Sequence, residues 1–135
     1  MAKKKVVAAF GYFDGVHTGH LRYLKEAKKL GGELVVFIGR DKAKWKPPKA
    51  FKLNENERKK LVEQLGVADR VILGSVKHAL EKVVRVKPDI IAITRYHPVD
   101  PEVLREELKR HKLNSKVVVI KKYKPKLYDK LFGNV

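Results

Sequence analysis

The stretch FGYFDGVHTGH, residues 10–20, decides the fold, because it stands between an apolar run and an amphipathic segment. The run before it, residues 6–10, is continuously apolar, which is typical of a strand buried on both faces of a parallel sheet. Gly11 and Gly15 allow a close approach of the backbone to a ligand, and Gly19 keeps the start of the following helix free of side-chain bulk. We therefore expect a turn from a central strand into a helix.

Two histidines at this turn are the main candidates for chemistry. His17 and His20 are three residues apart, so at a helix start they share one face of the first turn, beside unpaired amides and the positive end of the helix dipole. Phosphate is the usual occupant of such a site. Imidazole donors there could hold the charge that develops when a phosphoryl bridge breaks, which indicates nucleotidyl transfer. The alternative is an ordinary polar pair at a helix start; a zinc site is not expected, because no third ligand has recognisable spacing.

The rest of the chain alternates strands with helices. Strands are expected over residues 6–10, 33–38, 71–73, 90–94 and 116–120. Helices are expected over residues 20–30, 54–65 and about 100–111, and over a segment whose apolar side is Val76, Leu80, Val83 and Val84. This order predicts one α/β domain over residues 1–135, a Rossmann-like, doubly wound, five-stranded parallel sheet with helices on both faces.

Residues 11–20, GYFDGVHTGH, resemble the G-T-F-D-x-x-H-x-G-H signature of cytidylyltransferase-like nucleotidyltransferases, with Tyr12 in place of the usual threonine. Two later stretches, ADRVILGS at 68–75 and VKPDII at 86–91, resemble the archaeal FAD synthetase branch of that family. The resemblance implies an FMN adenylyltransferase, which joins FMN to AMP from ATP and releases pyrophosphate, with Mg²⁺ arriving on the ATP. The alternatives are a cytidylyltransferase for a polyol or amino-alcohol phosphate, and a nucleotide-binding domain that has lost catalysis.

A basic loop follows the second expected strand. Residues 42–49, KAKWKPPK, have no helical period and contain two prolines, and they start at the carboxyl edge of the sheet, where ligands bind. The resemblance implies that a lysine of this loop, Lys44 or Lys46, contacts the triphosphate as part of the catalytic set with His17 and His20. A solvated basic loop is the alternative.

The nucleotide-binding residues that we expect, partly from the turn and partly from the resemblance, are Phe10, Gly11, Tyr12, Phe13, Asp14, Gly19, Arg58, Thr94, Arg95, Tyr96, Lys122 and Lys124. Asp14 is not expected to act as a general base, because a phosphate nucleophile is already ionised. For Arg58 the alternative is a solvated helix arginine.

The sequence departs from the family pattern in two places. Residues 93–98 read ITRYHP where the family carries Gly-Asp or Gly-Pro-Asp, and no serine or threonine follows Ser115 to supply the hydroxyls of the second motif. Within residues 93–98, Tyr96 could stack on a base or flavin and Arg95 could pair with a phosphate. After Ser115, lysines such as Lys122 and Lys124 could supply charge in place of the hydroxyls.

The amino-acid composition limits the classes of partner that we expect for this protein. The chain has 32 Lys plus Arg against 15 Asp plus Glu, a net charge of +17, which attracts anions without naming one. A nucleic-acid partner is not expected, since no recognised module is visible. Without cysteine or an apolar run of membrane length, a cytoplasmic protein without a membrane association is expected. The lysine- and glutamate-rich composition is typical of a thermophile, and the resemblance also implies a homodimer.

Overall fold

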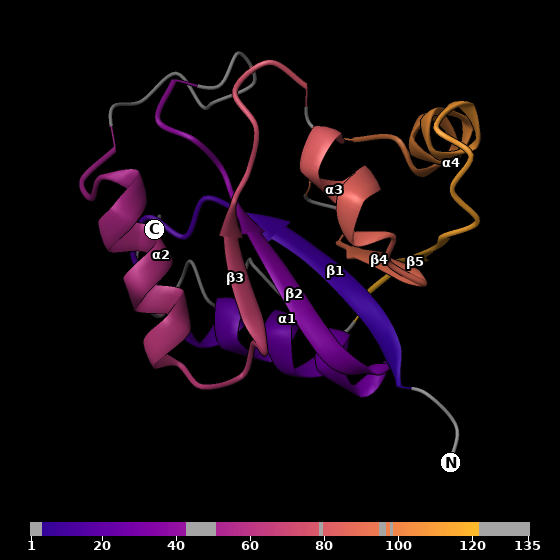
Figure 1. The fold of residues 1–135 in the computed structure, drawn as a ribbon. Coiled ribbons are helices and arrows are strands. Elements are labelled where there is room, and N and C mark those ends of the chain that lie inside the picture. The colour runs from indigo at the N-terminus through magenta and orange to yellow at the C-terminus, as the bar shows by residue number, and fades with distance from the viewer. Residues whose placement is uncertain (1–3, 43–50, 79, 95–96, 98, 122–135) are drawn as a thin grey trace.

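The computed structural model describes residues 4–42, 51–78, 80–94, 97 and 99–121. The elements alternate as predicted (Figure 1). They are β1 (Lys5–Gly11), α1 (Thr18–Lys29), β2 (Gly32–Ile38), α2 (Glu55–Gln64), β3 (Arg70–Leu73), α3 (Glu81–Val86), β4 (Ile90–Ile93), α4 (Pro101–Arg110) and β5 (Lys116–Val119). The five strands form one sheet in the order β3-β2-β1-β4-β5, and every neighbouring pair is parallel, which confirms the predicted fold with the first strand in the centre.

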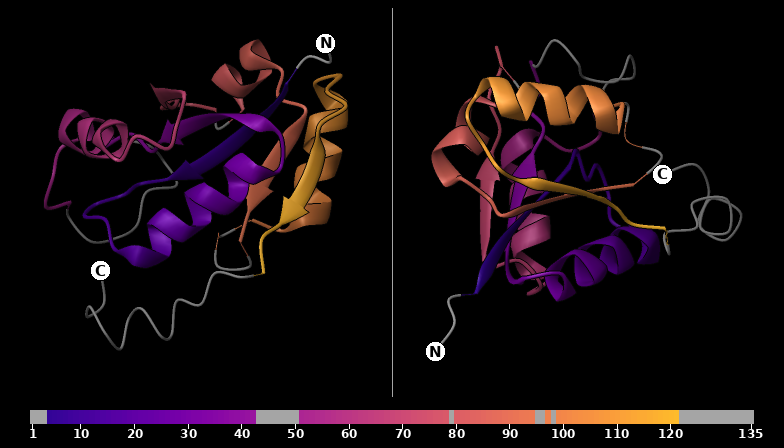
Figure 2. Two further views of the ribbon diagram at one scale, coloured as in Figure 1. Left: turned by 90° about the horizontal axis from the view of Figure 1, so that it is seen from below. Right: turned by 90° about the vertical axis from the view of Figure 1, so that its right-hand side faces the viewer.

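The central strand β1 is buried on both faces, as its continuous apolar run predicted. Val7 and Ala9 of β1 pack in one core with residues of α1 and α2, whereas Ala8 packs in a second core with residues of α3 and α4. Figure 2 shows α1 and α4 on opposite sides of the sheet. Helices cover both faces, so the sheet is doubly wound and its ligand edge lies at the carboxyl ends of the strands.

Two aspartates fix the strands at the opposite edge of the sheet. The backbone N–H of Asp69, before β3, donates to Leu34 O at 2.9 Å, and its carboxylate accepts the Leu34 N–H at 2.8 Å. Asp89, before β4, makes the same pair of bonds with Val6, at 2.9 and 2.8 Å. Asp69 and Asp89 belong to the two stretches that resemble the archaeal FAD synthetase branch. Each therefore fixes the alignment of its own strand with a central strand, near the amino end of that central strand.

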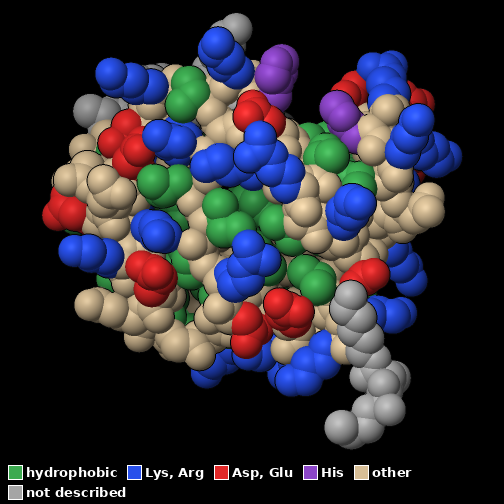
Figure 3. Space-filling model, viewed as in Figure 1, with side chains coloured by type: hydrophobic (Ala, Val, Ile, Leu, Met, Phe, Trp, Pro, Cys, Tyr) green, Lys and Arg blue, Asp and Glu red, His purple; other side chains and the backbone are tan. Residues whose placement is uncertain are grey.

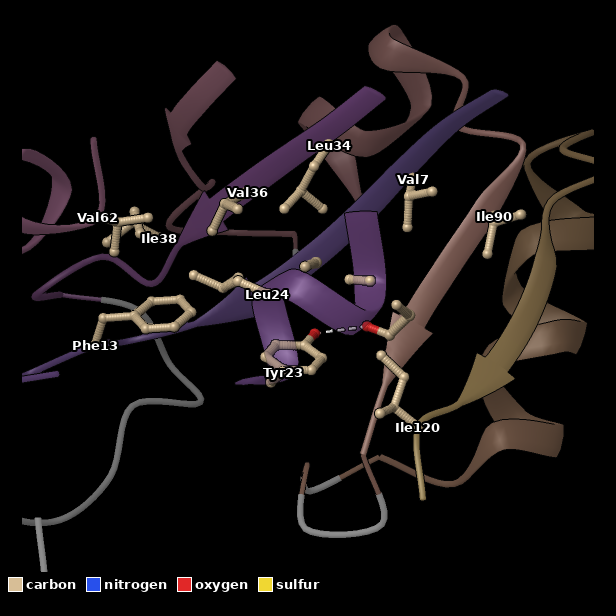
Figure 4. Packing of buried hydrophobic residues seen from close by; sticks show 13 residues of the cluster. Val7, Phe13, Tyr23, Leu24, Leu34, Val36, Ile38, Val62, Ile90 and Ile120 are labelled. Carbon is tan, nitrogen blue, oxygen red and sulfur yellow. Dashed lines mark hydrogen bonds between the residues drawn. The ribbon is translucent and has the colours of Figure 1, made fainter. Parts of the chain in front are cut away.

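Two helices differ from their predicted limits. α1 begins at Thr18 rather than at residue 20, because the His17 side chain caps it, and its buried residues include Tyr23 beside Leu24 and Ala27 (Figure 4). The predicted helix with Val76 on its apolar side is shorter than expected: α3 starts at Glu81. Its N-cap is Leu80, which makes no side-chain capping bond, and Val76 lies before the helix.

Among the residues that the structure describes, no helix is long and apolar enough to cross a membrane.

Candidate functional site

The histidine pair at the start of α1 forms a reciprocal cap. His17 is the N-cap residue, and its Nδ1 accepts the Gly19 N–H at 3.0 Å; the Nδ1 of His20 accepts the His17 N–H at 3.3 Å. The rings stack with centroids 4.0 Å apart. Because each Nδ1 accepts a backbone N–H, the proton of each neutral imidazole is on Nε2, on the far side of the ring. The pair therefore carries one Nε2–H donor on each ring at a helix N-terminus.

His20 is neutral at physiological pH. Burial, with a smaller contribution from charge on His17, lowers the pKa of His20 from 6.5 to about 4. Its Nε2–H therefore acts as a hydrogen-bond donor rather than as a permanent cation. A bound phosphate would place a negative charge beside His20, which favours the protonated imidazole and would raise its pKa.

The low pKa of His20 predicts acid sensitivity of the fold. Between about pH 6.5 and pH 4 the unfolded chain binds the His20 proton and the folded chain does not, so the free energy of unfolding falls as the pH falls through this window. The loss is expected to reach up to about 3 kcal/mol. Urea unfolding of wild type and His20→Asn at several pH values measures it, since asparagine can still accept the His17 N–H but does not titrate.

The wild-type stability should fall more steeply with acid than that of His20→Asn. Burial also lowers the pKa of His97, which adds acid sensitivity of the same sign in both proteins, so the difference between them isolates His20. Parallel stability profiles would contradict the prediction.

The turn between β1 and α1 depends on Phe13. This residue has a φ of 54°, an uncommon left-handed conformation for a side chain of its size. Its ring is buried and makes an edge contact with the His20 ring, with the ring centroids 5.4 Å apart. A Cβ on Gly11 would lie 2.6 Å from the Phe13 ring. Gly11 is therefore needed here to make room for Phe13. Gly19 is buried in the first turn of α1.

Asp14 ties the turn to a distant segment. Its two carboxylate oxygens accept the backbone N–H groups of Lys52, at 2.9 Å, and Leu53, at 2.8 Å. Tyr12 stacks on Phe51 of the same segment, with ring centroids 5.1 Å apart. The residues that follow the basic loop are thus held against the motif turn.

Arg58 joins both ends of the basic loop. Its side chain is fully buried and donates to Tyr12 O at 2.9 Å, Gly39 O at 2.8 Å and Leu53 O at 3.1 Å, and it pairs with the Asp41 carboxylate. The solvated-arginine interpretation is wrong. A nucleotide contact of Arg58 stays a prediction, and the described contacts give it a structural role.

Asp41 stands on the other side of the same network. Burial raises the pKa of its carboxyl, but hydrogen bonds from Arg58 and the Glu55 N–H outweigh that effect and hold the pKa below its usual value. The Glu55 carboxylate in turn accepts the Asp41 N–H at 3.0 Å and an Arg40 N–H at 3.0 Å. These hydrogen bonds hold the start of α2 against the residues that follow β2.

Tyr12, the departure from the family signature, requires a glycine at the end of β2. A Cβ on Gly39 would lie 2.3 Å from a carbon of the Tyr12 ring.

We expect Gly39→Ala to lower the free energy of unfolding by about 1–3 kcal/mol through overpacking. In a Tyr12→Thr background the same change should cost less, because the ring is gone. Unfolding free energies of the four proteins in this cycle measure the coupling, and an equal cost of Gly39→Ala in both backgrounds would refute it.

Two residues that the sequence did not reveal, Tyr23 of α1 and His97, lie at the end of β4 beside the predicted Thr94. Thr94 is buried, and its N–H donates to His97 Nδ1 at 2.9 Å, while His97 Nε2 bonds to Phe10 O at 2.9 Å. The Tyr23 hydroxyl accepts the Phe10 N–H at 3.2 Å and donates to Ala92 O at 2.6 Å. The position of Tyr23, one residue before Leu24 on the buried face of α1, could have indicated that its side chain is buried. Nothing in the sequence singles out His97.

Several predicted residues lie outside the described part of the chain: Lys44, Lys46, Arg95, Tyr96, Lys122 and Lys124. Of the others, the structure brings the β1–α1 turn, Arg58 and Thr94 to the same edge of the sheet. Among the described residues no three His, Asp or Glu side chains are grouped so as to hold a metal ion.

Comparison with known proteins gives three kinds of likeness. The cytidylyltransferase-like family matches residues 8–128. The FAD synthase of Thermoplasma acidophilum is 44% identical over 117 residues, which cover 87% of this chain and 82% of that protein. The FAD synthase of Ferroglobus placidus is 42% identical over 118 residues, which cover 87% of this chain and 76% of that protein.

Solved structures share the fold. The lipopolysaccharide core biosynthesis protein of Thermoplasma volcanium superposes with a TM-score of 0.85 at 39% identity, over 90% of this chain and 100% of that one. The pantoate-β-alanine ligase of Francisella tularensis superposes with a TM-score of 0.63 at 13% identity, over 87% of this chain and 59% of that one. The second likeness concerns the fold alone.

Proposed function

This chain belongs to the cytidylyltransferase-like family, and from that premise we propose that it is an FMN adenylyltransferase, which makes FAD and pyrophosphate from FMN and ATP. Relatives named FAD synthase, 44% and 42% identical over most of the chain, support this choice of substrates within the family. The observation in the structure that carries the proposal is the stacked, reciprocally capped pair of His17 and His20, with both donors on Nε2 at a helix N-terminus.

The reaction is one in-line displacement. An oxygen of the FMN phosphate forms a bond to the α-phosphorus of ATP as the bond from that phosphorus to the bridging oxygen breaks, and pyrophosphate leaves with the electron pair. His17 and His20 donate from Nε2 to phosphoryl oxygens, where negative charge grows during transfer, and the helix N-terminus adds partial positive charge. Neither ring has to give up its proton, in keeping with the neutral state of His20.

Magnesium enters with the triphosphate in this proposal. The carboxylate nearest the turn, Asp14, already accepts two backbone N–H groups, so it is a poor candidate for a metal ligand. Mg²⁺ bound to the triphosphate would supply positive charge against the leaving pyrophosphate. Lys44 or Lys46 would add charge there.

The surface charge favours anionic substrates in general. On the face shown in Figure 3, lysine and arginine side chains are spread among acidic and apolar ones. Together with the net charge of +17, this distribution raises the local concentration of nucleotides without choosing among them. The choice has to come from the site itself. The homodimer implied by the resemblance stays a prediction, which sedimentation would test.

Incubation of the purified chain with ATP, FMN and Mg²⁺ tests the proposal. FAD and pyrophosphate should form in equal amounts, and CTP with a polyol phosphate should give neither cytidylated product nor pyrophosphate. Pyrophosphate release from CTP and a polyol phosphate, without FAD formation from the first mixture, would replace the proposal with the cytidylyltransferase. ATP binding with no transfer to any acceptor would leave a nucleotide-binding domain.

A further inference from the structure

The ladder between β1 and β4 stops before either strand ends. β1 pairs with β2 over seven residues, up to Gly11 opposite Ile38, but with β4 only at Val7 opposite Ile90 and Ala8 opposite Ile91. Continued in the same register, the ladder would place Phe10 opposite Ile93. In a parallel pair the Phe10 N–H would then donate to Ala92 O, and the Thr94 N–H would donate to Phe10 O.

A side chain is inserted into each of these two missing bonds. The Tyr23 hydroxyl lies between Phe10 N and Ala92 O, at 3.2 and 2.6 Å (Figure 4 draws the second bond). The His97 imidazole lies between Thr94 N and Phe10 O, at 2.9 Å from each. All four backbone groups are therefore satisfied although the strands do not pair.

The two inserted rings also contact each other, with centroids 5.3 Å apart. Tyr23 comes from α1 and His97 from the segment after β4, so the pair fills the space between two strands from two different elements. Where paired strands would lie about 4.8 Å apart, each direct bond is replaced by two hydrogen bonds with a hydroxyl or a ring between them. The carboxyl ends of β1 and β4 are thus held open.

We propose that Tyr23 and His97 are positioning residues that hold β1 and β4 apart and so set the spacing of the two strand ends at which the nucleotide binds. This inference rests on the proposed function for the identity of the ligand. These strand ends lie where the chain changes from one side of β1 to the other, and doubly wound sheets bind their ligands at that point. Because the backbone groups between the strands are satisfied without a ligand, the spacing is set before ATP arrives, and binding does not have to break strand pairing.

The bonding pattern of His97 allows the contacts of its two ring nitrogens to be separated. Nδ1 accepts the Thr94 N–H and lies 3.0 Å from Thr94 Oγ1, so Nε2 carries the proton and donates it to Phe10 O. In His97→Asn the shorter side chain can reach only the Thr94 side, and in His97→Gln the longer one can reach only the Phe10 carbonyl. His97→Ala loses both contacts. His111, an exposed histidine at the end of α4, offers a matched control, His111→Ala.

Calorimetry with ATP on the full chain tests the inference. We expect His97→Ala to raise the Kd for ATP about tenfold or more, His97→Asn and His97→Gln to fall between it and wild type, and His111→Ala to bind as wild type does. Tyr23→Phe, which keeps the ring in the core, should weaken ATP binding in the same direction. A graded loss of affinity among variants with unchanged thermal midpoints is a result that a purely structural role would not give.

An ATP affinity of His97→Ala within twofold of wild type would overturn the inference. If His97→Ala does not fold, wild-type affinity in both His97→Asn and His97→Gln would overturn it equally. A wild-type chain that binds ATP but makes no FAD would refute the proposed transfer to FMN instead, and the order of ATP affinities would still decide the role of His97.

Discussion

Replacing His17 with asparagine is expected to slow FAD formation by about two to three orders of magnitude while the protein stays folded. Asparagine offers a side-chain oxygen close to where Nδ1 stands, so it can still cap α1 through the Gly19 N–H, which the His17 ring accepts at 3.0 Å. It has no group at the position of Nε2. The variant therefore removes the proposed donor and keeps the helix start.

The measurement follows FAD and pyrophosphate under saturating ATP and FMN, so that the loss is read as kcat. His20→Asn should behave similarly, because it too keeps an acceptor for a backbone N–H and loses the Nε2 donor. The double variant should lose less than the product of the two single losses, since the stacked rings act as a unit. His111→Asn serves as the control for the loss of an exposed histidine. A His17→Asn enzyme with kcat within tenfold of wild type would remove the histidine pair from the mechanism.

Replacing Arg58 with alanine is expected to lower the free energy of unfolding by about 3–5 kcal/mol. The fully buried guanidinium satisfies three backbone carbonyls and one carboxylate, and it lies over the Phe51 ring at 4.2 Å. Its removal would take the Arg58 donors from the three carbonyls and the charge partner from the Asp41 carboxylate, and it would detach the ends of the basic loop from each other.

Denaturant unfolding of three variants measures this loss. Arg58→Lys keeps the charge but cannot reproduce the fork of donors, so it should be intermediate. Lys60→Ala, which removes an exposed cation from the same helix, should change the stability by no more than about 0.5 kcal/mol. If Arg58→Ala costs no more than Lys60→Ala, the network does not hold the loop.

Local chemistry in the sequence was enough to predict the sheet and the helix start that carries the histidines. The apolar run of β1 indicated a strand buried on both faces, and its residues pack in two cores as expected. The spacing of His17 and His20 placed both rings on the first turn of α1. Such features depend on residues within a few positions of one another, so periodicity and capping chemistry report them directly.

Only the tertiary structure decided which distant groups those elements bring together. Arg58 looked like a candidate ligand residue and is buried against carbonyls from the β1–α1 turn and the end of β2. His97 had no signal at all, because its partner, Phe10 O, is 87 positions away along the chain. A hydrogen bond between such residues depends on where packing places two backbones, and a sequence pattern records the burial of each residue but not its partner.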